Sequence, residues 1–391
     1  MSARPRHFAL ACLALMLAGC AAPKPLPPQL TLTPVGFDAL PGWREDHAAA
    51  ALAAFVKSCA ELDRRPARAA VGPAALGMTA AAWRAPCVSA RATPRGDAAA
   101  RAFFERAFTP YLAASNEASD GLFTGYYEPL LHGARRPGGR YRTPILKRPP
   151  DLVMVDLGRF RPAWRGERIA GRVVAGSLVP YPSRAEIERG ALDLDRLALF
   201  WVDDPVDAFF LQVQGSGRIE LPNGALVRLG YDGQNGRPYV AIGKILVERG
   251  ALAADAVSLQ SIRAWIKAHP DQATALMDQN PSYVFFREQP GDGPIGSEGV
   301  VLSAGRSLAV DRGFIPLGAP VYLDVDDHDT ALRRLMVAQD TGGAIMGPVR
   351  GDVFWGFGAA AEARAGAMRA SGRYFLLLPK AVAAPRPPAL S

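Results

Sequence analysis

Short apolar runs of β type, separated by glycine-containing turns, fill the last third of the 391-residue chain. Strands are predicted at 283–286, 300–303, 320–325, 335–340, 353–355 and 373–378, and a helix near 359–368. A parallel doubly wound sheet needs a helix after nearly every strand, so this spacing favours a barrel or a sandwich. The sequence therefore predicts a mainly β fold with some helices.

Earlier segments add helices and further strands. Apolar residues recur at helical spacing in 46–62, 97–112 and 258–269. The second of these carries a stripe that we assign to the core, formed by Phe103, Phe104, Phe108 and Leu112. Ser183 and Glu186 have the spacing of a capping box that opens a short helix. Strands are predicted at 121–130, 209–214 and 227–231.

The N-terminus has the form of an export signal, with a basic start and an apolar core too short to span a bilayer. It ends Leu17-Ala18-Gly19-Cys20, which resembles the lipobox of bacterial lipoproteins. That resemblance implies removal of residues 1–19 and lipidation of Cys20. No Asp follows Cys20, which in that family implies the periplasmic face of the outer membrane. We expect a proline-rich tether over 20–40 and a disordered tail over 381–391.

Cysteine count and charge restrict the chemistry further. Cys12 would leave with the signal and Cys20 would be acylated, so Cys59 and Cys87 remain for a disulfide in an oxidising compartment. The net charge of +8 suits an anionic polymer such as peptidoglycan. The sequence has no block of Arg and Lys that would indicate nucleic-acid binding. The histidines show no metal-binding spacing and the glycine loops lack the Lys of a phosphate loop, so no metal or cofactor is predicted.

Two aspartates beside a glycine-rich loop are the strongest candidates for chemistry. An apolar run at 335–338 ends in Asp340, a loop containing Gly342 and Gly343 follows, and Asp352 opens another apolar run. If the two runs are neighbouring strands, the loop brings both carboxylates together. Carboxylates beside a loop floored by glycine can perform acid/base chemistry on a polymer that lies close to the backbone.

Together with Asp311, this pattern resembles the three-aspartate double-psi β-barrel. Three other blocks extend the resemblance: Gly125-Tyr126-Tyr127-Glu128-Pro129, Gln212-Val213-Gln214-Gly215-Ser216-Gly217 and Asn280-Pro281-Ser282-Tyr283-Val284-Phe285-Phe286. In this order they are similar to the membrane-bound lytic murein transglycosylase A family, from about 121 to 378.

The resemblance implies a double-psi barrel with N-terminal helices, built from 41–132 and 273–380. A second β-domain at 133–272 is inserted, and the glycan lies in the groove between the two. By position, Asp352 matches the family's single catalytic acid/base. Asp340 and Asp311 match its supporting or structural aspartates.

The implied reaction cuts the bond between N-acetylmuramic acid and N-acetylglucosamine without water, in cell-wall turnover. The sugar's own C6 hydroxyl attacks C1 and leaves a 1,6-anhydro end. A tethered nucleophile can have an effective molarity of about 10⁵ M or more, so one carboxyl group can suffice. Asp352 must then be protonated at rest, with a pKa raised above about 3.9 by burial against Phe354 or Trp355 and by the charge of Asp340. Asp340 is expected to hold the loop through backbone N–H groups.

Other residues are predicted to bind the glycan. A strand at 209–214 would place Gln212 and Gln214 on one face, where they and Ser216 could bond hydroxyl and N-acetyl groups. We expect stacking on sugar rings from one or two aromatic residues among Tyr126, Tyr127, Tyr283 and Phe286. The predicted contacts are completed by Thr124, Ser282, Gly342 and Gly343.

Alternatives to this reading stay open at this point. Glu128 is the rival acid, although it could pair with an arginine instead. A true glycoside hydrolase on a related barrel would use Asp340 as its second carboxylate. A non-catalytic glycan-binding lipoprotein is the third class, because fold alone does not decide function. The partners expected are glycan strands, the outer membrane through the lipid anchor, and murein synthases or scaffold proteins.

Overall fold

The computed structural model describes residues 27–164, 167–291, 293–327 and 330–380. The export signal, Cys20, the start of the tether and the tail lie outside these residues. The described chain is mainly β with several helices, which confirms the predicted class. No helix in these ranges is both long enough and apolar enough to cross a membrane.

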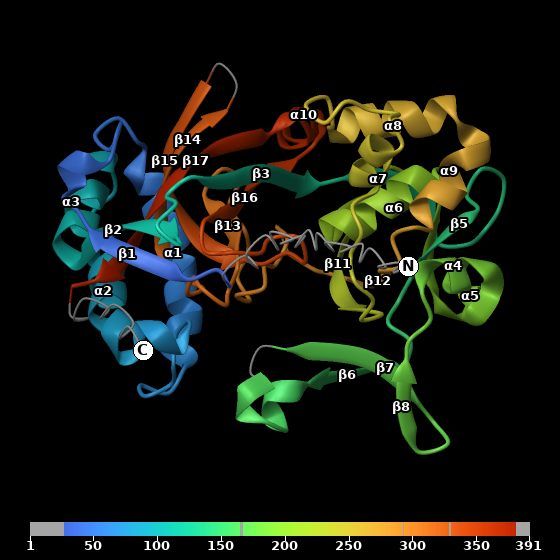
Figure 1. Ribbon diagram of the computed structural model, residues 1–391, viewed down its shortest axis with the longest axis horizontal. Coiled ribbons are helices and arrows are strands. Elements are labelled where there is room, and N and C mark those ends of the chain that lie inside the picture. Colours follow the sequence, from blue (N-terminus) through green and yellow to red (C-terminus); the bar gives the residue numbers. More distant parts are fainter. Residues whose placement is uncertain (1–26, 165–166, 292, 328–329, 381–391) are drawn as a thin grey trace, which may run out of the picture.

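One of the two bodies of the molecule is built around a closed barrel (Figure 1). Hydrogen bonding runs in the order β17–β14–β15–β13–β16–β3, and β3 pairs back with β17 to close the ring. The β13–β15 and β16–β3 pairs are parallel, and the others are antiparallel. The barrel strands are β3 (Gly121–Glu128), β13 (Ser307–Val310), β14 (Pro320–Asp327), β15 (Thr330–Asp340), β16 (Arg350–Phe357) and β17 (Arg369–Pro379). Two further strands, β1 (Leu30–Pro34) and β2 (Phe108–Ser115), extend the sheet beyond β17.

Helices α1 (Ala48–Arg64), α2 (Ala81–Ala92) and α3 (Asp97–Ala107) pack beside this sheet. The predicted disulfide between Cys59 and Cys87 is present and joins α1 to α2. Phe103, Phe104 and Phe108 are buried, as expected, but the predicted helix ends early. Phe108 starts β2, because Pro110 cannot continue a helix and the segment pairs with β17 instead.

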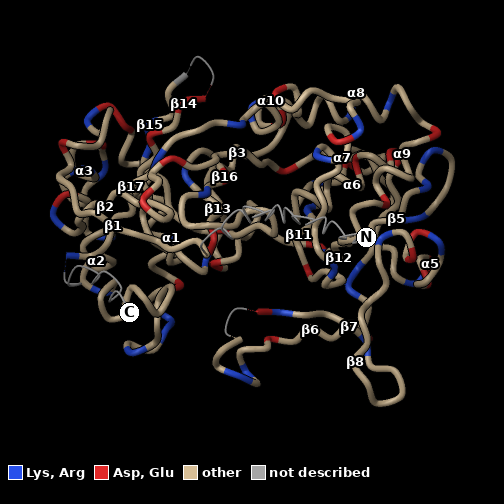
Figure 2. Tube along the Cα trace, viewed as in Figure 1, with Lys and Arg blue, Asp and Glu red and all other residues tan. Residues whose placement is uncertain are grey.

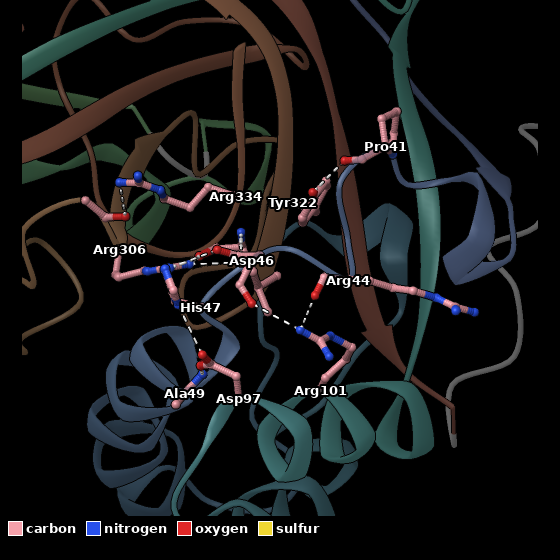
Figure 3. Close-up of polar contacts among 12 residues, drawn as sticks. Pro41, Arg44, Asp46, His47, Ala49, Asp97, Arg101, Arg306, Tyr322 and Arg334 are labelled. Atoms are coloured by element: carbon pink, nitrogen blue, oxygen red, sulfur yellow. Dashed lines mark hydrogen bonds and ion pairs between the residues drawn. The ribbon is translucent and has the colours of Figure 1, made fainter. Parts of the chain in front are cut away.

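Asp46 fastens the segment before α1 to the barrel (Figure 3). Its carboxylate is buried and accepts bonds from both terminal nitrogens of Arg306, at 3.0 and 2.9 Å. The backbone N–H of Leu335 donates a third bond at 2.8 Å. A buried carboxylate that is paired and fully bonded in this way ties the N-terminal segment to β15.

A second body follows β3 and holds its own sheet, in the order β12–β11–β10–β4–β9–β5. Its strands are β4 (Leu130–Ala134), β5 (Thr143–Leu146), β9 (Ala198–Val202), β10 (Ser216–Glu220), β11 (Leu226–Gln234) and β12 (Val284–Glu288). Its helices are α4 (Arg184–Glu186), α5 (Leu194–Leu197), α6 (Pro205–Gln214), α7 (Ile242–Glu248), α8 (Leu259–Ala268) and α9 (Pro270–Met277). The capping box of Ser183 and Glu186 opens α4, as predicted.

A three-stranded antiparallel sheet extends from the second body, at the bottom of the view in Figure 1, and packs against it through Met154 and Ala170. It consists of β6 (Val153–Asp156), β7 (Arg168–Val174) and β8 (Ser177–Pro180). Two short 3-10 helices, η3 (Leu157–Arg159) and η4 (Pro162–Trp164), follow β6. We call the described residues of 153–180 the arm. The remaining short turns are η1 (Phe37–Ala39), η2 (Ala74–Leu76) and the π-helical η5 (Ile187–Ala191).

Two predicted strands are absent from the structure. The strand at 209–214 is wrong, because these residues end helix α6. Val300 to Ser303 form no strand, and only Val301 makes an isolated bridge to Ile295. The helix at 258–269 is confirmed as α8, but Pro270 then opens α9, because proline fits the first turn of a helix. The helix predicted near 359–368 is α10 (Ala359–Ala367).

Candidate active site

The two leading aspartates lie in one row of the barrel sheet. Asp340 ends β15 and Asp352 lies in β16, and both are register partners of Ala309 in β13. Thr124 of β3 pairs with Asp352 on the other side. The sequence analysis considered the case in which the two aspartate strands are neighbours. In the structure they are not, because β13 lies between them. Adjacent strands are about 4.8 Å apart, so the two backbones lie about 10 Å from each other.

A groove of about 320 Å³ opens over this row, between the barrel and the second body. Most of the predicted site residues line it: Thr124, Tyr126, Gln212, Gln214, Ser282, Asp340, Gly342, Gly343 and Asp352. The aspartates come from the barrel, and the glutamines and Ser282 from the second body. A polymer lying in the groove would therefore contact both bodies.

Asp352 is half-buried at the base of the groove. Burial raises the pKa of its carboxyl to about 6. The hydroxyl of Thr124, which donates to Oδ1 at 2.6 Å, and the charge of Arg350 oppose this shift, whereas the charge of Asp340 adds to it. Phe354 follows two residues later on the same face of β16 and is buried. The carboxyl can therefore hold a proton under mildly acidic conditions, as the sequence analysis expected.

Asp340 has a different environment, because its oxygens are already occupied. Oδ1 accepts the backbone N–H of Thr341 and both the N–H and the hydroxyl of Ser297, each at 2.9 Å. Oδ2 accepts the hydroxyl of Tyr126 at 2.8 Å. Burial raises the pKa of Asp340, and these bonds oppose that shift. The expected role of holding the loop through backbone N–H groups fits this geometry.

Strand alternation on β3 serves both carboxylates. Thr124 and Tyr126 are two residues apart, so their side chains lie on one face of the strand. Thr124 donates to Asp352, and Tyr126 donates to Asp340. Thr124 and Tyr126 were both predicted to contact the glycan. In the structure the hydroxyl of each already donates to a carboxylate.

Arg350 was not predicted as a site residue, although it lines the groove. Its Nη2 donates to the hydroxyl oxygen of Thr124 at 2.8 Å, and its Nη1 donates to the carbonyl of Leu122 at 3.1 Å. The bond from Arg350 fixes the Thr124 oxygen as an acceptor, so that its proton points to Asp352. Alternation would have revealed Arg350, because it lies two residues before Asp352 on the same strand.

Asp311 lies outside the groove and stabilises the glycine loop from behind. One carboxylate oxygen accepts the N–H of Gly313 at 2.9 Å, and the other accepts the N–H of Gly347 at 2.7 Å. Gly347 has φ +110°, a conformation that favours glycine. At Gly343 an added Cβ would meet nothing within 4 Å, so the loop leaves open space there.

The glutamines reach the groove from a helix, not from a strand. Asp204 caps α6, Pro205 occupies its first turn, and Gly215 ends it with φ +77°, which are strong helix signals. Gln212 Oε1 accepts from Arg184 at 2.8 Å and from the N–H of Val284 at 3.2 Å. Gln214 Oε1 accepts the N–H of Tyr127 at 3.0 Å. Gln212 is buried, and its side chain also bonds Tyr283. With its oxygen bonded to protein, Gln214 can offer its amide nitrogen to a ligand.

Four predicted contacts lie elsewhere. Phe286 is 1% exposed in the core of the second body, so it cannot stack on a sugar. Tyr283 is also buried, beneath the guanidinium of Arg184. Tyr127 is buried as well, and Ser216 begins β10 away from the groove lining. Two exposed tyrosines that the sequence did not single out, Tyr231 and Tyr239, line the groove instead, together with Gln234.

Glu128 is not available as a rival acid. It is 1% exposed and pairs with Arg218 at 3.1 Å and with Arg228 at 2.9 Å. Both arginines belong to the second body, so the pairing joins β3 to the neighbouring sheet. The expectation of an arginine partner is confirmed.

A barrel that presents one proton-holding carboxyl at the base of an open groove defines a class of proteins suited to acid/base chemistry on an extended chain. Family models give the class a name. The model described as the MltA specific insert domain matches residues 122–287, and the 3D domain matches 306–378, which contain all three aspartates. The chain belongs to the membrane-bound lytic murein transglycosylase A family.

Curated relatives match about two thirds of the chain. Membrane-bound lytic murein transglycosylase A of Escherichia coli K12 is 35% identical over 264 residues, which are 65% of each protein. Its namesake in Vibrio cholerae is 31% identical over 68% of this chain and 67% of its own length. The chain thus matches about two thirds of the length of these relatives.

Solved structures cover more of the molecule. The Agrobacterium tumefaciens membrane-bound lytic murein transglycosylase has a TM-score of 0.81 at 34% identity, with 90% of this chain and 98% of that one covered. MltA from Neisseria gonorrhoeae, in its monoclinic form, has a TM-score of 0.75 at 36% identity, with 92% of this chain and 95% of that one covered. E. coli MltA with bound chitohexaose has a TM-score of 0.63 at 29% identity, with 90% of this chain and 94% of that one covered.

Proposed function

We propose that this protein is a peptidoglycan lytic transglycosylase that cuts the β-1,4 bond between N-acetylmuramic acid and N-acetylglucosamine without water. The main observation in support is the carboxyl of Asp352, whose pKa is raised to about 6 by burial at the base of a groove lined by two bodies. Two further findings support it. The relatives are named lytic murein transglycosylases, and one family member binds chitohexaose, a chain of N-acetylglucosamine units.

In the proposed reaction Asp352 acts twice. Its proton moves to the glycosidic oxygen as the bond from that oxygen to C1 of the muramic acid breaks. The carboxylate then accepts the proton of the C6 hydroxyl as O6 bonds to C1 and closes the 1,6-anhydro ring. Asp352 ends protonated, so the cycle needs no water and no external base. Thr124 and Arg350 would keep the carboxyl oriented through both steps.

The bonding of Asp340 favours this reaction over hydrolysis. A hydrolase of the inverting type needs a second carboxylate free to activate water. Asp340 already accepts four bonds, two from Ser297 and one each from Thr341 and Tyr126. We therefore assign it a supporting role, in which its charge helps to keep the proton on Asp352.

Mass spectrometry of sacculi digested with the chain lacking residues 1–20 tests the proposal. We expect soluble muropeptides that end in 1,6-anhydro-muramic acid. Products with a reducing muramic acid end, heavier by one water, would instead establish a hydrolase. Binding to sacculi with no soluble product would establish the non-catalytic class.

The domain division and the location complete the proposal. The closed ring of strands and its parallel pairs fit a double-psi barrel. We place the inserted body between β3 and β13, because its sheet begins at β4 and ends at β12; the insert is therefore longer at both ends than the 133–272 expected from the sequence. The curated relatives are named as membrane-bound proteins. We propose that acylated Cys20 is the anchor, at the periplasmic face of the outer membrane. Metabolic labelling with palmitate, and its loss in Cys20→Ala, tests the anchor.

A further inference from the structure

The arm has an apolar face that the described part of the molecule leaves uncovered. Strand register places one set of side chains on that face: Val153 and Val155 of β6, Ile169, Gly171 and Val173 of β7, and Leu178 and Pro180 of β8. Not one of these side chains is polar. Ile169, Val173 and Leu178 are 43%, 61% and 40% exposed. An antiparallel sheet normally turns an apolar face toward a core, so something outside the described chain should cover this one.

The opposite face of the arm points to the groove. Met154 and Ala170 pack against the apolar cluster of the second body. Arg168 lies on this same face; burial raises the pKa of the Tyr231 hydroxyl, and the charge of Arg168 opposes that shift. Tyr231 lines the groove. The apolar face is therefore directed away from the glycan side of the molecule.

The end of the arm carries arginines, drawn in blue in Figure 2, and exposed aromatic residues beside them. Phe160 is 72% exposed, and the guanidinium of Arg161 lies over the ring of Trp164 at 4.6 Å. Arg159 is exposed beside them. Arginine with tryptophan and phenylalanine is the residue set that settles at the interface of an anionic bilayer.

We propose that the apolar face of the arm lies on a phospholipid membrane that contains anionic lipid. Cys20, the proposed anchor, precedes the first described residue by only seven positions, which span at most about 25 Å. The folded chain would thus be held beside the bilayer, where an apolar face with arginines at one end would bind. A glycan strand fits this face poorly, because it offers no hydrogen-bonding side chain. Docked in this way, the groove faces the cell wall.

Vesicle binding tests the inference without the anchor, because the chain is prepared without residues 1–20. The variant combines Ile169→Thr, Val173→Thr and Leu178→Thr, since threonine suits strands while adding a polar hydroxyl. The matched control combines Val88→Thr and Leu226→Thr, which are 66% and 52% exposed on other surfaces. The probe is sedimentation with vesicles of phosphatidylethanolamine and phosphatidylglycerol.

We expect the parent and the control to bind these vesicles, and the triple variant to bind at least about tenfold more weakly. Digestion of sacculi in solution and the unfolding temperature should be the same in all three. Equal binding by the parent and the triple variant, or no binding by the parent, would overturn the inference. So would a parent dimer that the triple variant converts to monomers, because a second copy would then cover the face. Loss of digestion in the triple variant alone would assign the face to the glycan site instead.

Discussion

Asp352 and Asp340 belong to one row of the sheet, yet their surroundings fit them for different tasks. Asp352 accepts one hydroxyl bond, from Thr124, and faces the groove. Asp340 is held by the backbone of two loops and by Tyr126. Paired carboxylates whose environments differ in this way take separate roles. The division comes from the neighbours of each residue and not from residue type.

Replacing Asp352 by asparagine should remove the only proton carrier that we assign to the reaction. We expect Asp352→Asn to lower turnover of sacculi by about 10³-fold or more, while affinity for chitooligosaccharides, measured by calorimetry, stays near that of the parent. Glu220→Gln, at a half-exposed carboxyl outside the groove that pairs with His132, is the control and should keep full activity. Turnover like the parent's in Asp352→Asn would refute the assignment.

Thr124 affects the pKa of the Asp352 carboxyl. Its hydroxyl bond favours the charged carboxylate, so Thr124→Val should raise the pKa of Asp352 above about 6. The reaction needs the protonated form, which is lost as pH rises through the pKa. The falling limb of the rate profile should therefore move to higher pH, by about one unit. Rates over a pH series would reveal the shift, and an unmoved limb in an otherwise folded variant would contradict it.

At the scale of elements, the disulfide fixes how α1 and α2 pack. Cys59 and Cys87 are 28 residues apart in sequence and both are fully buried. Reduction should lower the free energy of unfolding by about 3 kcal/mol, as judged by urea titration with and without reductant. The double variant Cys59→Ser with Cys87→Ser should no longer respond to reductant. A parent whose urea midpoint is the same in reductant would argue against a stabilising role.

Sequence patterns gave most strands of the barrel but failed where two signals competed. The run at 209–214 has the alternation of a strand, yet Asp204, Pro205 and Gly215 mark the two ends of a helix, and those signals decide the outcome. Phe108 continued an apolar helical stripe, but pairing with β17 drew it into a strand. The second error arises because local periodicity carries no information about the partner across a sheet.

At the scale of the whole molecule, the candidate site is an arrangement that no single segment encodes. The three aspartates were found from their local turns. That β13 lies between β15 and β16 follows only from the ring of strand pairs, and so does the row that joins Thr124 to both aspartates. Likewise, Tyr231 and Tyr239 reach the groove only because the second body packs beside the barrel. These contacts are too distant in sequence for pattern and spacing to reveal.

Glu128 joins the two bodies whose separation sets the width of the groove. It ends β3 of the barrel and pairs with Arg218 of β10 and Arg228 of β11, and Arg218 also lies over the ring of Phe357 at 3.6 Å. Neutralising a buried carboxylate leaves both guanidinium groups without their counter-charge. Glu128→Gln should therefore lower the free energy of unfolding by about 3 kcal/mol.

The effect on catalysis separates a spacing role from a chemical one. If Glu128 positions the walls of the groove, Glu128→Gln should raise KM for glycan strands more than it lowers kcat, because Asp352 and its proton are unchanged. The control is Glu288→Gln, which breaks a half-exposed pair with Arg135 in the same body and should cost less than about 1 kcal/mol. Urea titration and initial rates on soluble glycan strands measure both quantities. A fall in kcat alone, with unaltered KM, would mean that Glu128 acts on the reacting groups and not on the distance between the two bodies.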